Sequence, residues 1–212
     1  MTARRVITWR NTGVLKPSEK VSIFDEGIVK IANDLYHTMI ASFGAGIAAP
    51  QIGEKKSVCV VSSNYVPSLN PDPKLLVGDA VVLINPVINP IGEETFVWEE
   101  QCLSVPDFSA NVKRYKTVEV QYQNLSGDFL KVEVSDVESG TIQHEVDHLY
   151  GKLFIHRLSG LSRKLAFQKL RKNYRNSTEN SSIKSKKKAT RSKKKPRVKK
   201  PKTYGKNKNK RR

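Results

Sequence analysis

Two histidines, His144 and His148, lie four residues apart, and Glu145 directly follows the first of them. On a helix, positions i and i+4 lie above one another on the same face, so both imidazoles can bind one metal ion. The neighbouring carboxylate can then reach a water molecule on that ion, which is an arrangement typical of hydrolysis. A chance H-E-x-x-H string is disfavoured, because the chain contains only 4 His.

Two histidines leave such a site one ligand short, since a tetrahedral catalytic site usually has three protein ligands and one open position. The remaining candidates are several carboxylates and four other side chains: His37, His156, Cys59 and Cys102. Only Cys102 lies in a segment whose composition suggests exposure. Cys59 is interpreted as a core residue, and the two other histidines as packing, surface or structural residues.

A second stretch with possible chemistry is the glycine-rich segment 44–53. Its glycines and small side chains let a ligand or another strand approach the backbone closely, and Gln51 can place an amide there. A tight turn between a helix and a strand is an equal alternative on these residues alone. A phosphate-binding loop is excluded, because neither the glycine spacing nor a following Lys-Ser fits.

Helices must position these residues. Apolar residues recur at helical spacing between Ile28 and Met39, which predicts an amphipathic helix capped by Ser22 or Asp25 and ending near Ser42.

The helix with the histidine pair is expected to start after Ser135 or Asp136 and to end at Gly151. Gly140 is unfavourable inside it. A third helix is predicted for residues 161–174.

Strands are predicted for five segments, residues 57–62, 80–84, 94–98, 117–123 and 129–134. Residues 124–128 form a hairpin-like connection between the last two. Residues 64–78 are expected to be a surface loop, and Asn85-Pro86 and Asn89-Pro90 are expected to form turns.

Positive charge is confined to the end of the chain. Residues 171–212 hold 20 of the 38 Lys and Arg and a single acid, Glu179, so their net charge is +19. The formal net charge of the whole chain is +18, so residues 1–170 carry −1. The composition of the tail cannot offset the entropy of folding. We therefore expect one catalytic domain over residues 1–170 and a disordered basic tail over residues 171–212.

The cysteine count and the N-terminus bear on the compartment. Two cysteines do not make a disulfide framework, and the N-terminus has no apolar run long enough for a secretion signal or membrane span. A cytoplasmic enzyme with no membrane contact is expected. An organellar matrix is the alternative, because the first 18 residues are basic and contain no acid, although Val6 to Trp9 is interpreted in preference as an opening strand.

Three segments, taken together, resemble the motifs of the peptide deformylases. Residues 44–51 match G-Φ-G-Φ-A-A-x-Q throughout, and residues 143–148 match Q-H-E-x-D-H. Residues 100–104 match E-G-C-L-S except that Gln101 replaces the glycine. The resemblance covers about residues 5 to 165, and Ser109 stands where many relatives have arginine.

The resemblance implies an α+β fold, with a single deformylase-like domain in which antiparallel or mixed sheets surround a central metal-binding helix. It implies removal of the N-formyl group from nascent polypeptides that begin with formylmethionine. The site residues that it implies are the metal ligands Cys102, His144 and His148, the acid/base Glu145, the oxyanion donors Gln51 and the Leu103 amide, and the substrate-binding Gly46.

The resemblance also implies one divalent ion, Fe²⁺ as the native metal, with Zn²⁺, Ni²⁺ or Co²⁺ as substitutes. A mixed thiolate and imidazole set by itself suggests Zn²⁺. Formylated nascent peptides are the expected partners, with the ribosome or its RNA as a further partner of the basic tail.

The alternative function is a catalytically impaired deformylase-like protein that binds RNA or the ribosome through the tail. The complete ligand set favours the active enzyme over this alternative. A third interpretation, a general zinc peptidase, is weakened by the context of Cys102 as a ligand and by the small residues of segment 44–53.

Overall fold

A computed structural model describes residues 2–69 and 76–175. The chain divides into two units, Met1–Ala166 and Phe167–Arg212. Residues 160–175 are helical, which confirms the third predicted helix. The remainder of the predicted basic tail, residues 176–212, lies outside the described residues.

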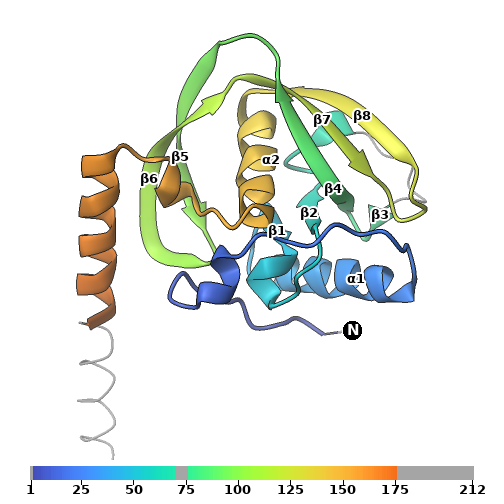
Figure 1. The fold of residues 1–212 in the computed structure, drawn as a ribbon, viewed down its shortest axis with the longest axis horizontal. Coiled ribbons are helices and arrows are strands. Elements are labelled where there is room, and N and C mark those ends of the chain that lie inside the picture. Colours follow the sequence, from blue (N-terminus) through green and yellow to red (C-terminus); the bar gives the residue numbers. More distant parts are fainter. Residues whose placement is uncertain (1, 70–75, 176–212) are drawn as a thin grey trace, which may run out of the picture. The chain divides into compact units, whose positions relative to one another are not determined.

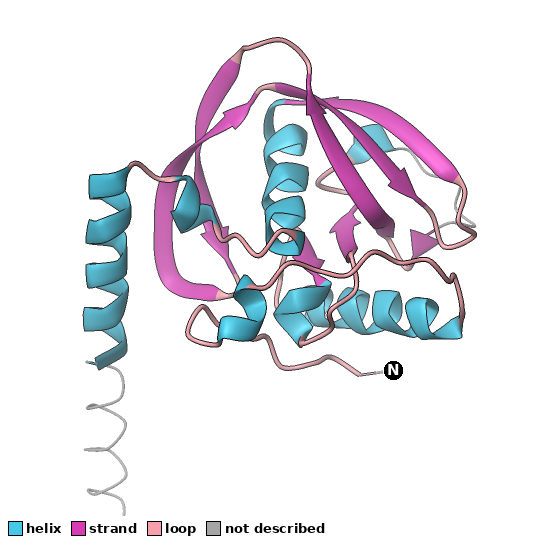
Figure 2. Cartoon of the chain, viewed as in Figure 1, coloured by secondary structure: helices cyan, strands magenta, loops and turns pink. Residues whose placement is uncertain are grey.

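The first unit is α+β, as predicted, and its sheets are antiparallel (Figure 2). A sheet of six strands has the order β1-β2-β4-β7-β8, with β3 paired to β4, and β5 and β6 form a second sheet. The helices are α1 (Glu26–Ala41) and α2 (Asp136–Leu149). The strands are β1 (Gly46–Ala48), β2 (Val58–Ser62), β3 (Leu76–Val77), β4 (Ala80–Pro90), β5 (Thr95–Cys102), β6 (Val105–Tyr115), β7 (Thr117–Gln123) and β8 (Phe129–Ser135). Short 3-10 helices are η1 (Thr12–Leu15), η2 (Ala49–Ile52), η3 (Pro67–Leu69) and η5 (Phe154–Arg157).

The part of the larger sheet formed by β1, β2 and the first half of β4 is buried on both faces, which explains the uninterrupted apolar run of β2. Alternate side chains of a strand point to opposite faces. Cys59 and Val61 belong to the core shared with α2, whereas Val58 and Val60 belong to the core shared with α1. The two helices therefore cover opposite faces of the sheet, and α2 runs through the middle of the unit (Figure 1).

The first helix begins where the sequence predicts. The Asp25 carboxylate accepts a hydrogen bond from the Ile28 backbone N–H at 3.2 Å, so Asp25 rather than Ser22 is the N-cap. At the other end, the Gly44 N–H donates to the Met39 carbonyl at 3.0 Å. This closure places Phe43 in the left-handed region with φ 55°, where glycine is usual.

The second helix is polar but buried along most of its length, from Ser139 to Leu149. Its apolar members, such as Ile142 and Val146, pack into the core. Gln143 fixes the helix to the end of β6, because its amide donates to the Tyr115 carbonyl at 2.8 Å and accepts from the Tyr115 N–H at 3.2 Å. The helix is thus tied to the end of β6 inside the unit.

The two Asn-Pro pairs are not turns, which corrects the sequence prediction. Both lie within β4, whose pairing with β7 shifts register between Ile84 and Val87. Asn85 adopts φ 51° at this bulge. Its amide exchanges hydrogen bonds with the backbone N–H and carbonyl of Val21, both at 2.8 Å, so the side chain satisfies groups that a ladder partner would otherwise satisfy.

The predicted opening strand over Val6 to Trp9 is also wrong, because these residues form no regular strand. They form a strap that makes isolated backbone bonds. The Ile7 N–H donates to the Gln51 carbonyl at 2.7 Å, and the Trp9 N–H donates to the Ser104 carbonyl at 2.8 Å. The strap therefore contacts two of the three motif segments.

Candidate metal centre

Helix α2 and the end of β5 bring three potential metal ligands together. One ligand atom each from Cys102, His144 and His148 lies within 4.8 Å of the others, and all three side chains are buried. His37, His156 and Cys59 are not in this cluster. Cys102 is thus the third candidate ligand expected from the sequence, but it is not exposed as its segment suggested.

Local hydrogen bonds orient the two imidazoles. Nδ1 of His144 lies 2.7 Å from a carboxylate oxygen of Glu100, which leaves Nε2 of the ring available to bind a metal ion. Nε2 of His148 lies 3.2 Å from Sγ of Cys102. Among the described residues, the buried Oε2 of Glu145 and Nδ1 of His148 have no hydrogen-bond partner. One sulfur donor, two nitrogen donors and an unpaired carboxylate oxygen fit a divalent transition-metal ion.

The electrostatics favour a thiolate even before an ion is present. Burial alone would raise the pKa of Cys102, but the neighbouring His148 and His144 lower it to about 5. Burial would likewise lower the pKa of His144, yet its hydrogen bonds to Cys102 and Glu100 raise it well above the usual value. A divalent cation would replace the proton on the imidazole as the positive charge beside the thiolate, because metal ligands bind as thiolate and neutral imidazole.

Glu145 lies where a proton acceptor is needed. Burial raises the pKa of its carboxyl group to about 7, against the opposing effect of the nearby histidines. Its side chain lies directly against Gly46 in β1, where a Cβ atom would come within 2.8 Å of Oε1. Because residue 46 has no side chain, the backbone of β1 beside the Glu145 carboxylate stays open to a substrate.

Cys59 also lies near this carboxylate but remains a core thiol, as predicted. Burial, with a contribution from the charge of Glu145, raises the pKa of Cys59 well above its usual value.

Gln51 links the glycine-rich segment to the cysteine segment. Its amide donates to Oγ of Ser104 at 3.2 Å, and its Nε2 lies 3.8 Å from Sγ of Cys102. Its amide oxygen accepts from the Ala48 N–H at 2.8 Å, which fixes the orientation of the side chain. Leu103 lies against Gly44, where a Cβ would be 3.1 Å from its Cδ1. All three motif segments therefore meet at one place.

A buried ion-pair network behind the three candidate ligands was not predicted from the sequence. Arg114 donates to both carboxylate oxygens of Glu100 at 2.6 and 3.0 Å, and to Asp147 at 2.6 Å. Arg157 completes the network at Asp147. Despite burial, the hydrogen bonds from His144 and Arg114 lower the pKa of Glu100 to about 2. The sequence signal that could have indicated this network is Asp147, a charged residue between the two histidines in the buried part of α2.

The two departures from the family motifs lie at the surface of the hairpin formed by β5 and β6. Gln101 is exposed, and it is not among the described non-glycine residues with positive φ. It pairs with Ser109, whose hydroxyl donates to Glu99 at 2.6 Å. The backbone at residue 101 therefore does not require glycine.

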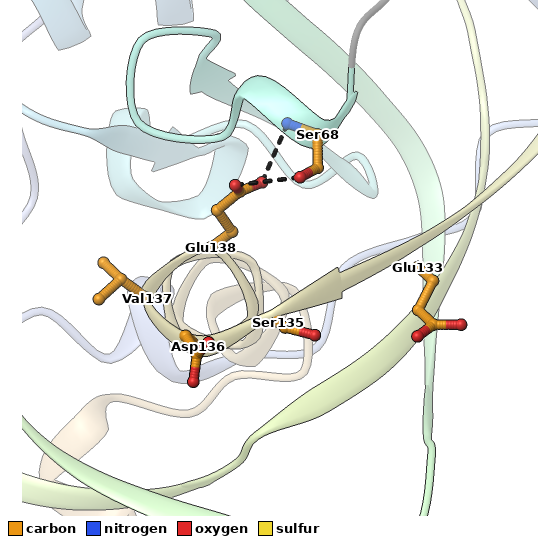
Figure 3. A pocket seen from close by; sticks show the side chains of 6 residues that line it. All are labelled: Ser68, Glu133, Ser135, Asp136, Val137 and Glu138. Atoms are coloured by element: carbon orange, nitrogen blue, oxygen red, sulfur yellow. Dashed lines mark hydrogen bonds between the residues drawn. The ribbon is translucent and has the colours of Figure 1, made fainter.

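A separate surface hollow of about 410 Å³ lies at the start of α2 (Figure 3). It shares no lining residue with the metal centre. Glu138 spans it by accepting hydrogen bonds from the N–H and hydroxyl of Ser68, both at 3.0 Å. Asp136 and Glu138 belong to the first helical turn, where negative charge stabilises the N-terminus of a helix, so these two acids of the lining have a structural explanation.

Comparison with known proteins agrees with these motifs. The family described as polypeptide deformylase matches residues 3–164. The chain is 38% identical over 172 residues to the peptide deformylase of Desulfotalea psychrophila, covering 81% of this chain and 97% of that protein. It is also 38% identical over 175 residues to the peptide deformylase of Campylobacter jejuni, with the same two shares.

A solved structure shows the same fold. The peptide deformylase from Ehrlichia chaffeensis in complex with actinonin superimposes with a TM-score of 0.70 at 32% identity, covering 82% of this chain and 98% of that one. In the described part of the chain, no helix combines the length and the apolar character needed to span a bilayer.

Proposed function

The chain belongs to the polypeptide deformylase family, and we propose that Cys102, His144 and His148 hold the divalent metal ion of this hydrolase. As a family member, the chain removes the N-formyl group of formylmethionine from nascent polypeptides and releases formate. The observation that carries the assignment is the buried cluster of one thiol and two imidazoles beside an unpaired carboxylate oxygen.

In the proposed reaction, the ion supplies Lewis acidity when bound. The carboxylate of Glu145 accepts a proton from water, whose oxygen adds to the formyl carbon. The C–N bond then breaks, and Glu145 returns the proton to the leaving amine. The products are formate and a free amino terminus.

Negative charge that develops on the formyl oxygen needs fixed donors. We assign these to the Gln51 amide and the Leu103 backbone N–H, since each such donor is worth about 3 to 4 kcal/mol. The hydrogen bond from Ala48 keeps the Gln51 amide oriented. The bare backbone at Gly46 is assigned to substrate binding, because it lies beside the proton acceptor.

The test is formate release from formyl-Met-Ala by the iron-loaded protein. Glu145→Gln should keep the ion and lose about 100-fold or more in kcat, because only the proton acceptor is removed. Glu138→Gln, on the same helix but tied to Ser68, serves as the matched control and should keep full turnover. Near-normal turnover in Glu145→Gln would refute the acid/base assignment.

For the identity of the ion, we propose Fe²⁺ in the native protein, with Zn²⁺, Ni²⁺ or Co²⁺ able to substitute. The donor set supports a borderline transition metal but does not select one, since imidazole and thiolate suit several. Metal analysis of protein purified without oxygen, compared with the activity of each reconstituted form, distinguishes them. Higher activity with Zn²⁺ than with Fe²⁺ would overturn the proposal.

We further propose that the basic tail binds the ribosome through its RNA. The support is the charge of +19 over residues 171–212, next to −1 over the rest of the chain. Formylated substrates emerge at the ribosome, so retention there would bring enzyme and substrate together. The alternative, an impaired enzyme that acts mainly as an RNA-binding module, is not supported, because the relatives are deformylases and the ligand cluster is complete.

A further inference from the structure

We propose that Trp98 is a positioning residue of the metal centre: its indole N–H holds Glu100, and Glu100 holds the ligand His144. The inference rests on the proposed ligand role of His144. It adds an indole and a helix glycine, Gly140, which lie outside the three motifs, to the residues that set the geometry of the site.

The contacts form a continuous chain. The indole Nε1 of Trp98 donates to Oε1 of Glu100 at 3.0 Å, and Oε2 of Glu100 lies 2.7 Å from Nδ1 of His144. Arg114 also donates to each of the two oxygens. Oε1 thus receives two donors, which prevents the carboxylate from rotating and keeps Oε2 directed at His144.

Arg114 cannot hold Glu100 independently of the rest of the network. Its third donor is engaged by Asp147 at 2.6 Å, and Asp147 is in turn bound by Arg157. The position of the guanidinium therefore depends on two carboxylates at once. Trp98 supplies a donor to Glu100 that is independent of the Asp147 side of the network.

Gly140 is what allows the indole to reach Glu100. A Cβ on Gly140 would lie 2.7 Å from Cε2, 2.8 Å from Cζ2 and 2.9 Å from Nε1 of Trp98. Glycine is disfavoured inside helices, yet it lies here in the buried part of α2. The three indole atoms that a side chain at residue 140 would displace include the Nε1 that donates to Glu100. The size of residue 140 is therefore coupled to the orientation of His144.

The first test removes only the donor. Trp98→Phe keeps an aromatic ring but lacks the N–H, so the parent and the variant are loaded with Ni²⁺ and the rate of ion loss to excess chelator is measured. Mutation of a residue that hydrogen-bonds to a metal ligand typically lowers metal affinity about 10-fold or more, so we expect roughly tenfold faster loss. Trp9→Phe, the matched control, should lose the ion at the parental rate. An unchanged rate in Trp98→Phe overturns the proposal.

The second test is a double-mutant cycle, which separates positioning from general packing. Gly140→Ala should accelerate ion loss in the parent, because it displaces the indole. In a Trp98→Ala background the same change should have no effect, because the indole is gone. Equal effects in both backgrounds would mean that Gly140 acts on the helix alone, and the proposal would fall.

A spectroscopic readout is available because the chain contains only 2 Trp. With Trp9 replaced by Phe, Trp98 is the remaining tryptophan, and its fluorescence should change with stoichiometric Ni²⁺ binding. Unchanged fluorescence despite binding would count against the contact chain. If the parent bound no Ni²⁺ at all, the metal-site assignment itself would fail, which is a different result from parental ion loss in Trp98→Phe.

Discussion

Gly46 and Glu145 touch across β1 and α2, so closely that a Cβ on Gly46 would lie 2.8 Å from both Cγ and Oε1 of Glu145. Real side chains do not approach so closely, so Gly46→Ala must displace the carboxylate. We expect kcat for formyl-Met-Ala to fall about 100-fold with the metal content unchanged, since a displaced general base loses its contribution. Gly160→Ala is the control, because a Cβ at residue 160 would meet no atom of the described residues within 4 Å. Parental kcat in Gly46→Ala would show that the carboxylate can move without consequence.

Cys102→Ala should abolish stoichiometric metal binding. In the proposed site the thiolate is one of three protein donors, and two imidazoles on one helix would hold an ion far less tightly. The measurement is metal per chain after dialysis. Cys59→Ala is the matched control, since Cys59 is a buried core residue outside the cluster, and it should bind metal normally. Unchanged affinity in Cys102→Ala would refute the ligand assignment.

The pH dependence should follow Glu145, which must be ionised to accept a proton. Burial raises its pKa to about 7 in the metal-free protein, and a bound cation lowers it. We therefore expect kcat/KM to fall on an acid limb with an apparent pKa below about 7. If no acid limb appears between pH 5 and 7, either the metal lowers the pKa of Glu145 further or a different group is the base. The residual activity of Glu145→Gln decides between these two explanations.

The same shift has a consequence for stability without metal. The folded-state pKa of Glu145 is raised, so its contribution to stability is present at low pH and lost as the pH rises through about 7. Metal-free Glu145→Gln should therefore exceed the parent in Tm at pH 8 by more than at pH 5. Equal differences at both pH values would contradict the buried environment described for this carboxyl group.

Phe43→Gly should stabilise the protein. Phe43 is 97% exposed and adopts φ 55°, a conformation that costs an L-residue about 1 to 2 kcal/mol and glycine little. Thermal unfolding should show a higher Tm. Phe43→Ala keeps the Cβ and hence the strain, so it should not gain stability. A gain in both variants would attribute the effect to the lost aromatic ring instead.

Truncation after Tyr174 should leave formyl-Met-Ala turnover intact and weaken ribosome binding. The removed residues carry most of the net positive charge, and contacts between lysines and phosphates release counterions, so binding by the full chain should fall steeply with salt. Co-sedimentation with ribosomes over a salt series measures this. Undiminished co-sedimentation, or lost turnover on the dipeptide, would contradict a docking role separate from catalysis.

The parts of the fold that the sequence predicts are those whose signals are local. The Asp25 cap and the apolar spacing predict α1, and the turn at residues 124–128 predicts the hairpin of β7 and β8. Strand β6 was missed, because its burial depends on pairing with β5 and its buried residues include Arg114. The bulge at Asn85 was missed for a related reason, since the bonds from Val21 that stabilise it come from a distant segment.

The same distinction applies to the metal centre. The clustering of Cys102, His144 and His148 could be predicted because the two histidines share a helix face, and the cysteine lies in a segment matched to a family motif. The network of Glu100, Arg114 and Asp147 could not, because it joins a hairpin to a helix through a register that no local pattern specifies. The contact between Trp98 and Gly140 could not be predicted either, because the sequence does not show that these two residues meet.

The N-terminal strap bears on the order in which the protein can fold during synthesis. Trp9 leaves the ribosome early, yet its backbone partner Ser104 follows only after nearly half of the chain has been made, and α2 comes later still. Contacts so distant in sequence form slowly. The segments around the metal centre therefore remain open to solvent until most of the first unit has emerged, which makes ion capture a late event in the maturation of the nascent chain.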